Sequence, residues 1–513
     1  MRSCPPAFSI KRHRILFKRR QICYTAPMRK LCIVPVLLMA VLSAAAARTE
    51  PPVFTTAAAP GKNEYVLFVN FYDWGAAADK AIICCAKAKA EKSVKVADFT
   101  ADVIINSATG EANSGYGIVK GHRTIEAAYL CDKEGKRVTG SSRYIALEMK
   151  VGPEEKLSNP FLEIPVITKF NQTYGMRISN DELDISISKR SAVVSPLAAA
   201  FARGSYQTGD TTMEYLSWEP EQKAPGTPLI IWLHGSSDGS STNVYRLLFS
   251  TKAVSLIDNT VQQHFSQGAC VLMPQCPANW MISEDGDPLG NKVWVPVDIE
   301  GKVRKVANPL KKIIRKIFSL PEPDLSHQEA KAAVSYYTRP LKELIDRYIA
   351  QHPFIDKNRI YIGGCSAGGY MTVNMCLQYK DFFAAAFPVC EAYPDSKLLD
   401  SDIEALSALP LWFTYAENDE TIDPEEHTVP TLARLKEQNP LDLHVSRFAD
   451  VHDTTGLYKQ KNPDGTETNE PYQYEGHYAW VYALNNQCTD GALSLFSWLA
   501  RQKRAGFSAG TVI

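Results

Sequence analysis

A serine in the run Gly364-Cys365-Ser366-Ala367-Gly368 has the spacing of a nucleophile on a sharp turn. The strand-like stretch RIYIG precedes it and the helix-like stretch AGGYMTVNMCLQY follows it. A strand–turn–helix lifts a serine oxygen clear of the sheet, and glycines on either side let backbones pass close to it. The alternative is a glycine-rich turn with an incidental serine. In this context we predict that Ser366 is a nucleophile on an elbow formed with Gly364 and Gly368.

A serine hydroxyl needs a base to remove its proton and a carboxylate to orient that base. In the chain order Ser, Asp, His, both partners follow the nucleophile. The strand-like run LWFTY ends at Tyr415, and Asp419 follows it by four residues. A loop there can turn a carboxylate back toward a histidine, so Asp419 is the predicted acid. Close alternatives are Glu417, Glu420 and Asp423.

Four histidines follow the nucleophile and are candidates for the base. His427 and His444 come before or inside the last strand-like run, Leu443–Phe448, which is too early for this order. His477 lies in the run GHYAW, on a loop just before a helix-like stretch. We therefore predict His477 as the base. His452 is the second candidate, and its other interpretation is a surface loop residue near the site.

Acyl transfer also needs two backbone N–H groups that stabilise an oxyanion. One is predicted to be the amide of Ala367, directly after the nucleophile. The other should come from the loop LHGSSDGS after an early strand, with Ser236 as the predicted donor and Ser237 as the alternative. His234 in that loop is interpreted as a structural histidine rather than a second base.

These residues must be positioned by a sheet, and the second half of the chain has the pattern of one. Short, continuously apolar runs alternate with helix-like stretches from about residue 205 to 505, which is typical of a parallel sheet covered on both faces. The expected fold is therefore α/β, a doubly wound, mainly parallel sheet. Residues 283–335 interrupt the alternation as an insertion with one basic amphipathic helix, interpreted as part of a cap rather than a membrane-docking element.

The preceding part of the chain has the period-two pattern of half-buried strands. From 65 to 190 it predicts a small β-sandwich, which the resemblance described below identifies as immunoglobulin-like. Residues 48–64 and 191–204 are expected to be linkers, and 506–513 a tail. The alternation occurs in three places: Val94 and Val96; Ile145, Leu147 and Met149; and Leu183, Ile185 and Ile187.

The first 47 residues hold nine basic and no acidic side chains. Within them Met28-Arg29-Lys30 precedes the apolar run Leu31–Leu42, and three alanines end at Ala47. This pattern predicts a secretory signal peptide that starts near Met28, with 1–27 as an over-called start and the mature protein secreted or periplasmic. A short amphipathic anchor is the alternative interpretation.

The composition of the chain argues against a nucleic-acid-binding protein, a membrane-spanning protein and a zinc site. The 513 residues contain 56 basic and 56 acidic side chains, so removing 1–47 leaves a net acidic protein. A nucleic-acid partner is therefore not expected, because such binding needs concentrated positive charge. No apolar run is long enough for a membrane span. The nine cysteines after residue 47 contain no C-x-x-C pair, which argues against a zinc site, although one or two disulfides are possible.

Taken together, LHGSSDGS, MPQCP, GGCSAGGYM and GHYAW resemble the secreted esterases related to polyhydroxybutyrate depolymerases and feruloyl esterases. Residues 121–161 are similar to the immunoglobulin-like N-terminal domain that some bacterial esterases carry. The resemblance implies an α/β-hydrolase fold and maps the triad onto Ser366, Asp419 and His477. This chain departs from the family in having Ser236-Ser237 where many relatives have a Gly- or Ala-rich loop, and Tyr415-Ala416 in place of a His-Gly pair.

The leading hypothesis is a secreted serine carboxylesterase that works through an acyl-enzyme and needs no metal or organic cofactor. Its substrate would be a small-molecule, polysaccharide-linked or polyester ester. The second hypothesis is a serine peptidase of the prolyl-oligopeptidase type, and the third is a non-catalytic binding protein on a hydrolase scaffold. Aromatic residues near the motifs could line a cleft or belong to the core: Trp280, Trp294, Trp480 and Tyr482.

Overall fold

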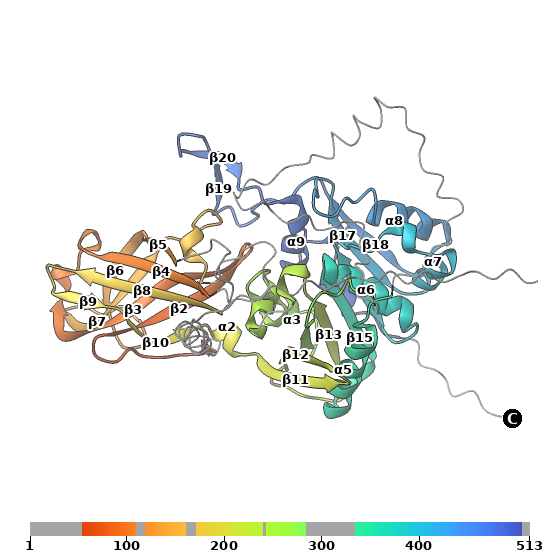
Figure 1. Cartoon of the computed structure of the whole chain (residues 1–513), viewed down its shortest axis with the longest axis horizontal. Coiled ribbons are helices and arrows are strands. Elements are labelled where there is room, and N and C mark those ends of the chain that lie inside the picture. The colour runs from red at the N-terminus through yellow and green to blue at the C-terminus, as the bar shows by residue number, and fades with distance from the viewer. Residues whose placement is uncertain (1–53, 109–117, 161–170, 240–242, 284–333, 505–513) are drawn as a thin grey trace, which may run out of the picture. The chain divides into compact units, whose positions relative to one another are not determined.

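The computed structural model of the chain describes residues 54–108, 118–160, 171–239, 243–283 and 334–504. The predicted signal segment, the predicted C-terminal tail and nearly all of the predicted cap insertion lie outside these residues. Figure 1 shows the described elements along the chain. Among them, no helix is long and apolar enough to cross a membrane.

The N-terminal part is built from two sheets whose inner faces share one apolar core. One sheet has the order β1-β10-β2-β3-β7-β6 and the other the order β5-β4-β8-β9. Tyr65 and Leu67 from the first sheet and Met176 and Ile178 from the second are buried in the same cluster. The strands are β1 (Phe54–Thr55), β2 (Glu64–Tyr72), β3 (Gly75–Ala90), β4 (Thr100–Ala108), β5 (Ile118–His122), β6 (Ile125–Cys131), β7 (Ser141–Met149), β8 (Asn171–Asn180), β9 (Ile185–Ile187) and β10 (Lys189–Val194).

Two local expectations for this part were wrong. Val94 and Val96 do not belong to a strand, because residues 91–93 and 96–98 form 3₁₀ turns and Val96 is exposed. A two-residue alternation is too short to decide between a strand and a turn. The segment 191–204 is not an open linker either. Its first residues pair with β2 as part of β10, the short helix α2 (Pro196–Ala199) follows, and Ala202 begins the next sheet.

The second part contains an eight-stranded sheet of order β11-β12-β14-β13-β15-β16-β17-β18. β12 runs antiparallel to both of its neighbours, and the strands from β14 to β18 are mutually parallel. This confirms the predicted α/β-hydrolase architecture. The strands are β11 (Ala202–Thr208), β12 (Thr211–Trp218), β13 (Thr227–Leu233), β14 (Cys270–Gln275), β15 (Ile355–Cys365), β16 (Ala385–Val389), β17 (Leu411–Ala416) and β18 (Leu443–Phe448).

Both faces of this sheet are covered. Along β13, Ile230 and Trp232 pack in one apolar cluster, and Leu229 and Ile231 in another, as expected when alternate side chains leave opposite faces. α6 is buried from Ala367 to Leu377. The helices of this part are α3 (Asn259–Gln262), α5 (Thr338–Gln351), α6 (Ala367–Gln378), α7 (Asp400–Ser407), α8 (Thr428–Glu437), α9 (Trp480–Leu484) and α10 (Leu495–Leu499).

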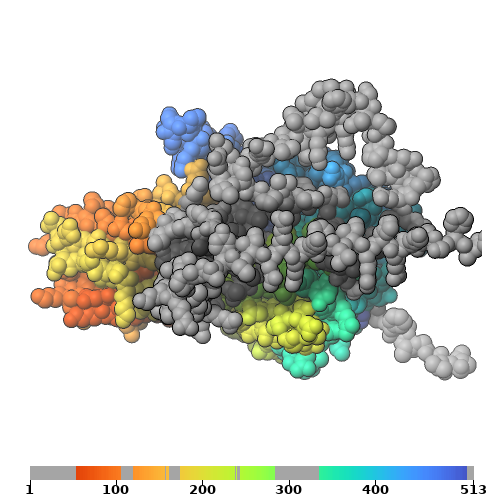
Figure 2. Space-filling view, in the orientation of Figure 1, coloured from red at the N-terminus to blue at the C-terminus, as the bar shows by residue number. Residues whose placement is uncertain are grey.

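The long connection after β18 contains the antiparallel hairpin β19 (Lys459–Lys461) and β20 (Glu467–Pro471). Figure 2 shows this hairpin as a blue lobe standing out from the surface. A second small pair, β21 (Thr489–Asp490) and β22 (Leu493–Ser494), precedes α10. The nine cysteines from Cys84 to Cys488 are all buried and free, so no disulfide connects these described residues.

Candidate active site

Ser366 lies on the turn between β15 and α6, as the sequence context indicates. Its backbone is in the left-handed region, with φ 58° and ψ −120°, and its N–H donates to the carbonyl of Val389 on the next strand at 3.0 Å. The side chain is half-buried. A Cβ atom on Gly368 would lie 2.1 Å from the carbonyl oxygen of Leu233, so only glycine allows α6 to approach β13 this closely.

Asp419 and His477 meet at the same edge of the sheet. The Nδ1 atom of His477 lies 2.7 Å from Oδ2 of Asp419, and both residues are buried. Oδ1 of the same carboxylate accepts hydrogen bonds from the amides of Thr421 and Ile422, each at 2.8 Å. Oδ1 of Asp419 therefore stabilises the conformation of its own loop, while Oδ2 binds the imidazole of His477.

The loop that carries His477 packs directly on the loop that carries Asp419. A Cβ atom on Gly476 would lie 2.3 to 2.5 Å from atoms of Asn418, its backbone carbonyl among them. Because glycine has no side chain, the Gly476 backbone can lie directly against Asn418. This brings the neighbouring histidine and carboxylate within hydrogen-bond distance.

The alternative acids and bases have other partners. Glu417 is exposed and pairs with Arg447 at 2.7 Å, and Asp423 accepts the amide of Glu425. His452 lies beside Asp450 and the hydroxyl of Tyr482. The others are placed as follows: His427 against the carbonyl of Asp423, and His444 between Asp442 and Asp490.

The loop after β13 runs beside the nucleophile. A Cβ atom on Gly235 would lie 3.7 Å from Cβ of Ser366. Ser236 begins a 3₁₀ turn over Ser236–Asp238 and is half-buried, and Ala367 is the first residue of α6. The first amides of a helix have no partner within it, so the N–H of Ala367 is not used by α6 itself.

His234 is a structural histidine. Its Nε2 accepts the amide of Cys276 at 2.9 Å, so the proton is on Nδ1, which donates to the carbonyl of Gly235 at 2.6 Å. Burial lowers the pKa of His234 to about 4, which keeps the ring neutral. Trp280 donates from Nε1 to the carbonyl of His234 at 3.1 Å. The imidazole therefore connects two loops and has no free nitrogen to act as a base.

Sequence reasoning missed a buried carboxylate in this loop. Asp238 accepts hydrogen bonds from Ser250 Oγ at 2.5 Å and from Arg246 Nε at 3.4 Å, and its carbonyl accepts from Gln275 Nε2 at 2.9 Å. These contacts fix the end of the 3₁₀ turn that begins at Ser236. The available signal was an acidic residue close behind a continuously apolar run, a place where a charge must find partners. The same signal marks Glu391, which follows the apolar strand β16.

The aromatic residues near the motifs are mostly packing residues. Trp280 is fully buried against His234, and Tyr482 stacks on Phe448 with ring centroids 4.0 Å apart. Trp480 packs edge-on against His477 at 5.5 Å between centroids, so it supports the imidazole. Trp294 lies outside the described residues.

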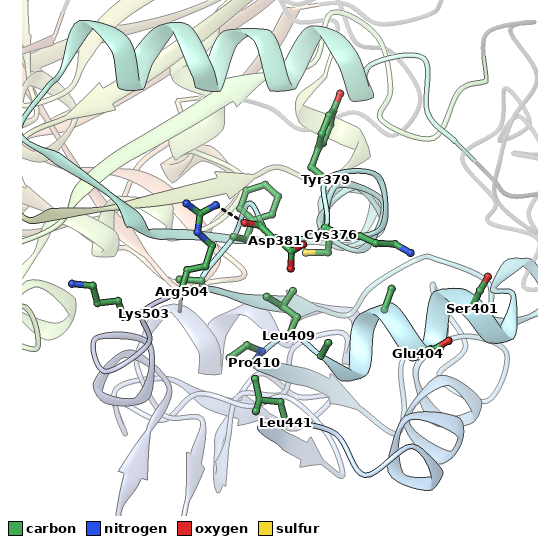
Figure 3. Close-up of a pocket in the computed structure, with 15 residues that line it drawn as sticks. Cys376, Tyr379, Asp381, Ser401, Glu404, Leu409, Pro410, Leu441, Lys503 and Arg504 are labelled. Carbon is green, nitrogen blue, oxygen red and sulfur yellow. Dashed lines mark hydrogen bonds between the residues drawn. The ribbon is translucent and has the colours of Figure 1, made fainter. Parts of the chain in front are cut away.

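A groove of about 640 Å³ lies at the opposite edge of the sheet (Figure 3). It is lined by the end of α6 and by residues that precede β16 and β17, with Lys503 and Arg504 beside them. Arg504 donates to the carbonyl of Asp381 and to Asn358. None of Ser366, Asp419 and His477 lines this groove. Within the described ranges, no group of three or more His, Cys, Asp or Glu side chains is arranged to hold a metal ion.

Because the unfolded chain protonates His234 near pH 6.5 and the folded chain only near pH 4, the unfolded state binds more protons between these values. Acidification from about pH 6.5 to about pH 4 should therefore lower the free energy of unfolding by about 3 kcal/mol through this residue. Urea unfolding across this range should show a smaller loss for His234→Asn than for the wild type. Exposed His122→Asn is the control, and an equal loss in His234→Asn would contradict the assignment.

Two family models match the chain. Residues 64–196 match the esterase immunoglobulin-like N-terminal domain, and residues 341–441 match the prolyl oligopeptidase family. The second match includes β15, Ser366, α6 and Asp419. The chain thus has one segment similar to the esterase-associated N-terminal module and one segment similar to the prolyl oligopeptidase family.

Two individual proteins are also similar to this chain. A thermostable esterase of solved structure superposes with a TM-score of 0.56 at 18% identity, over 86% of this chain and all of that one. A stretch of 49 residues is 43% identical to poly(3-hydroxyalkanoate) depolymerase C of Paucimonas lemoignei, covering 10% of this chain and only 12% of that protein. The chain therefore has an α/β-hydrolase fold that follows a domain matching the esterase immunoglobulin-like module, and these similarities support a serine hydrolase.

Proposed function

We propose that the protein is a secreted serine carboxylesterase with the triad Ser366, Asp419 and His477. Oγ of Ser366 attacks the ester carbonyl while Nε2 of His477 takes its proton, and Asp419 accepts the Nδ1–H and stabilises the imidazolium. The imidazolium then protonates the departing alcohol. Water, activated by the same histidine, hydrolyses the acyl-enzyme and regenerates Ser366.

The observation that carries the proposal is the buried His477–Asp419 contact of 2.7 Å at the edge of the sheet that holds Ser366. A carboxylate so placed fixes the tautomer with the proton on Nδ1, which leaves Nε2 as the base. The amides of Ala367 and Ser236 are the proposed oxyanion donors. The loop packed beside Ser366 supports the choice of Ser236, because it brings that backbone to the nucleophile.

An ester is proposed as the substrate rather than a peptide because of the N-terminal module. The described N-terminal part is a two-sheet sandwich that matches the esterase-associated domain. A peptidase of the prolyl-oligopeptidase type remains the second candidate, because the segment 341–441 matches that family. Secretion is proposed from the basic and apolar pattern of residues 28–47.

The first test compares hydrolysis of a short-chain p-nitrophenyl ester and a Gly-Pro anilide by the chain from about Arg48. We expect turnover of the ester and none of the anilide. Ser366→Ala should lower the ester turnover to near the level of the blank, because it removes the proposed nucleophile. Anilide cleavage that depends on Ser366 would favour the peptidase, and inactivity of folded protein on both substrates would contradict the proposed function.

The second test separates Asp419 from its acidic neighbours. Asp419→Asn should lower kcat for the ester by about 10³- to 10⁴-fold, since the amide favours the wrong tautomer of His477. Glu417→Gln is the matched control, as this exposed side chain is on the same loop and pairs with Arg447. It should leave kcat within twofold of the wild type. Equal losses in the two variants would argue against Asp419 as the acid.

A further inference from the structure

Glu391 is a buried carboxyl group that the proposed chemistry does not use. It follows β16 by two residues and is only 2% exposed. Its Oε2 accepts the amide of Tyr393 at 2.6 Å, and its Oε1 accepts the hydroxyl of Thr428 at 3.1 Å. Among the described residues, no cation forms an ion pair with it; Arg434 of α8 pairs with Asp395 and Asp400.

The backbone of Glu391 lies against the turn that carries the nucleophile. Val389, two residues earlier, accepts the amide hydrogen bond of Ser366. The intervening residue Cys390 has φ 37°, and its own N–H donates to the carbonyl of Thr414 on β17. A Cβ atom on Gly369 would lie 2.7 Å from Cα of Glu391. A shift of Glu391 would therefore displace the first turn of α6 and the acceptor of the Ser366 amide.

The carboxyl end of the same side chain contacts the start of α8. Thr428 is the first residue of this ten-residue helix, which follows the loop that carries Asp419. A carboxylate near a helix N-terminus is stabilised by the helix dipole. Burial raises the pKa of Glu391 to about 7, against the hydrogen bonds from Tyr393 and Thr428, which lower it. Glu391 thus spans the distance between the turn of Ser366 and the end of the Asp419 loop.

We propose that Glu391 is a positioning residue that holds the Ser366 turn and the Asp419 loop in register through its hydrogen bond to Thr428. It touches no reacting atom, so its removal should lower the rate of the chemical step and leave substrate binding nearly unchanged. The inference rests on the triad proposed above but not on the nature of the substrate.

The test therefore uses two readouts, ester turnover and the rate at which a fluorophosphonate labels the serine. The fluorophosphonate forms a bond from Ser366 Oγ to phosphorus, expels fluoride and passes the serine proton to His477, whatever the natural substrate. Labelling should be absent in Ser366→Ala. If the wild type is not labelled at Ser366, the triad itself fails; if it is labelled without turning over esters, only the ester assignment fails.

We expect Glu391→Ala to lower both kcat and the labelling rate by about tenfold or more, with KM within about twofold, when measured well below its unfolding temperature. Thr428→Val should show a smaller loss in the same direction. In the double variant the two losses should not multiply, because both changes break the same link. Glu391→Gln should recover most of the rate, since its amide can still accept from Tyr393 and donate to the Thr428 hydroxyl.

Asp395→Asn is the matched control. Asp395 also connects this segment to α8, through Thr431 and Arg434, but it does not adjoin Val389 or Gly369. It should lower the unfolding temperature with little change in the labelling rate. The proposal would be overturned by a folded Glu391→Ala that labels within twofold of the wild type, by multiplying losses in the double variant, or by an equal rate loss in Asp395→Asn.

Discussion

The proposed active site depends on the strained backbone of Ser366. A non-glycine residue at φ 58° and ψ −120° costs about 1–3 kcal/mol and persists only where its surroundings fix it. Here the Ser366 amide donates to Val389, its carbonyl accepts from Tyr370, and the glycine two residues on packs against Leu233. The register of β13, β15 and β16, in which Leu233 pairs with Gly364 and Cys365 with Val389, sets the contacts with Val389 and Leu233. The bond from Tyr370 is the first helical hydrogen bond of α6.

Three buried carboxylates at the carboxyl ends of the strands stabilise the loops around this serine. Asp238 follows β13, Glu391 follows β16 and Asp419 follows β17, and each is at most 5% exposed. Burial of a charge is unfavourable unless hydrogen bonds replace its hydration. Each carboxylate accepts hydrogen bonds from its own or a neighbouring segment, so the cost of burying the charge is offset only when the loops are correctly placed. These hydrogen bonds, together with side-chain packing, therefore favour one arrangement of the loops.

Local patterns in the sequence were enough to predict the strand–turn–helix at Ser366, because strand, turn, glycines and helix are all within a few residues of it. The order of strands and helices likewise sufficed for the α/β architecture. The partners of Glu391 and Asp238 could not be found in this way, since Thr428 and Ser250 are brought to them only by the folded sheet. At Val94 a local pattern gave a wrong prediction: a short alternation indicated a strand, but the backbone on either side forms two 3₁₀ turns.

The choice among the acidic residues after β17 follows from where the backbone leaves the sheet. Glu417 still donates its N–H to Phe448 at the end of β18, so its side chain remains with the exposed edge and reaches Arg447. Two residues later Asp419 closes a turn with its own carboxylate, accepting the amides of Thr421 and Ile422. A short side chain is needed for this, because Oδ1 must return to the backbone while Oδ2 faces the imidazole of His477. An aspartate just past the last sheet hydrogen bond satisfies both demands, which a longer glutamate on the strand edge does not.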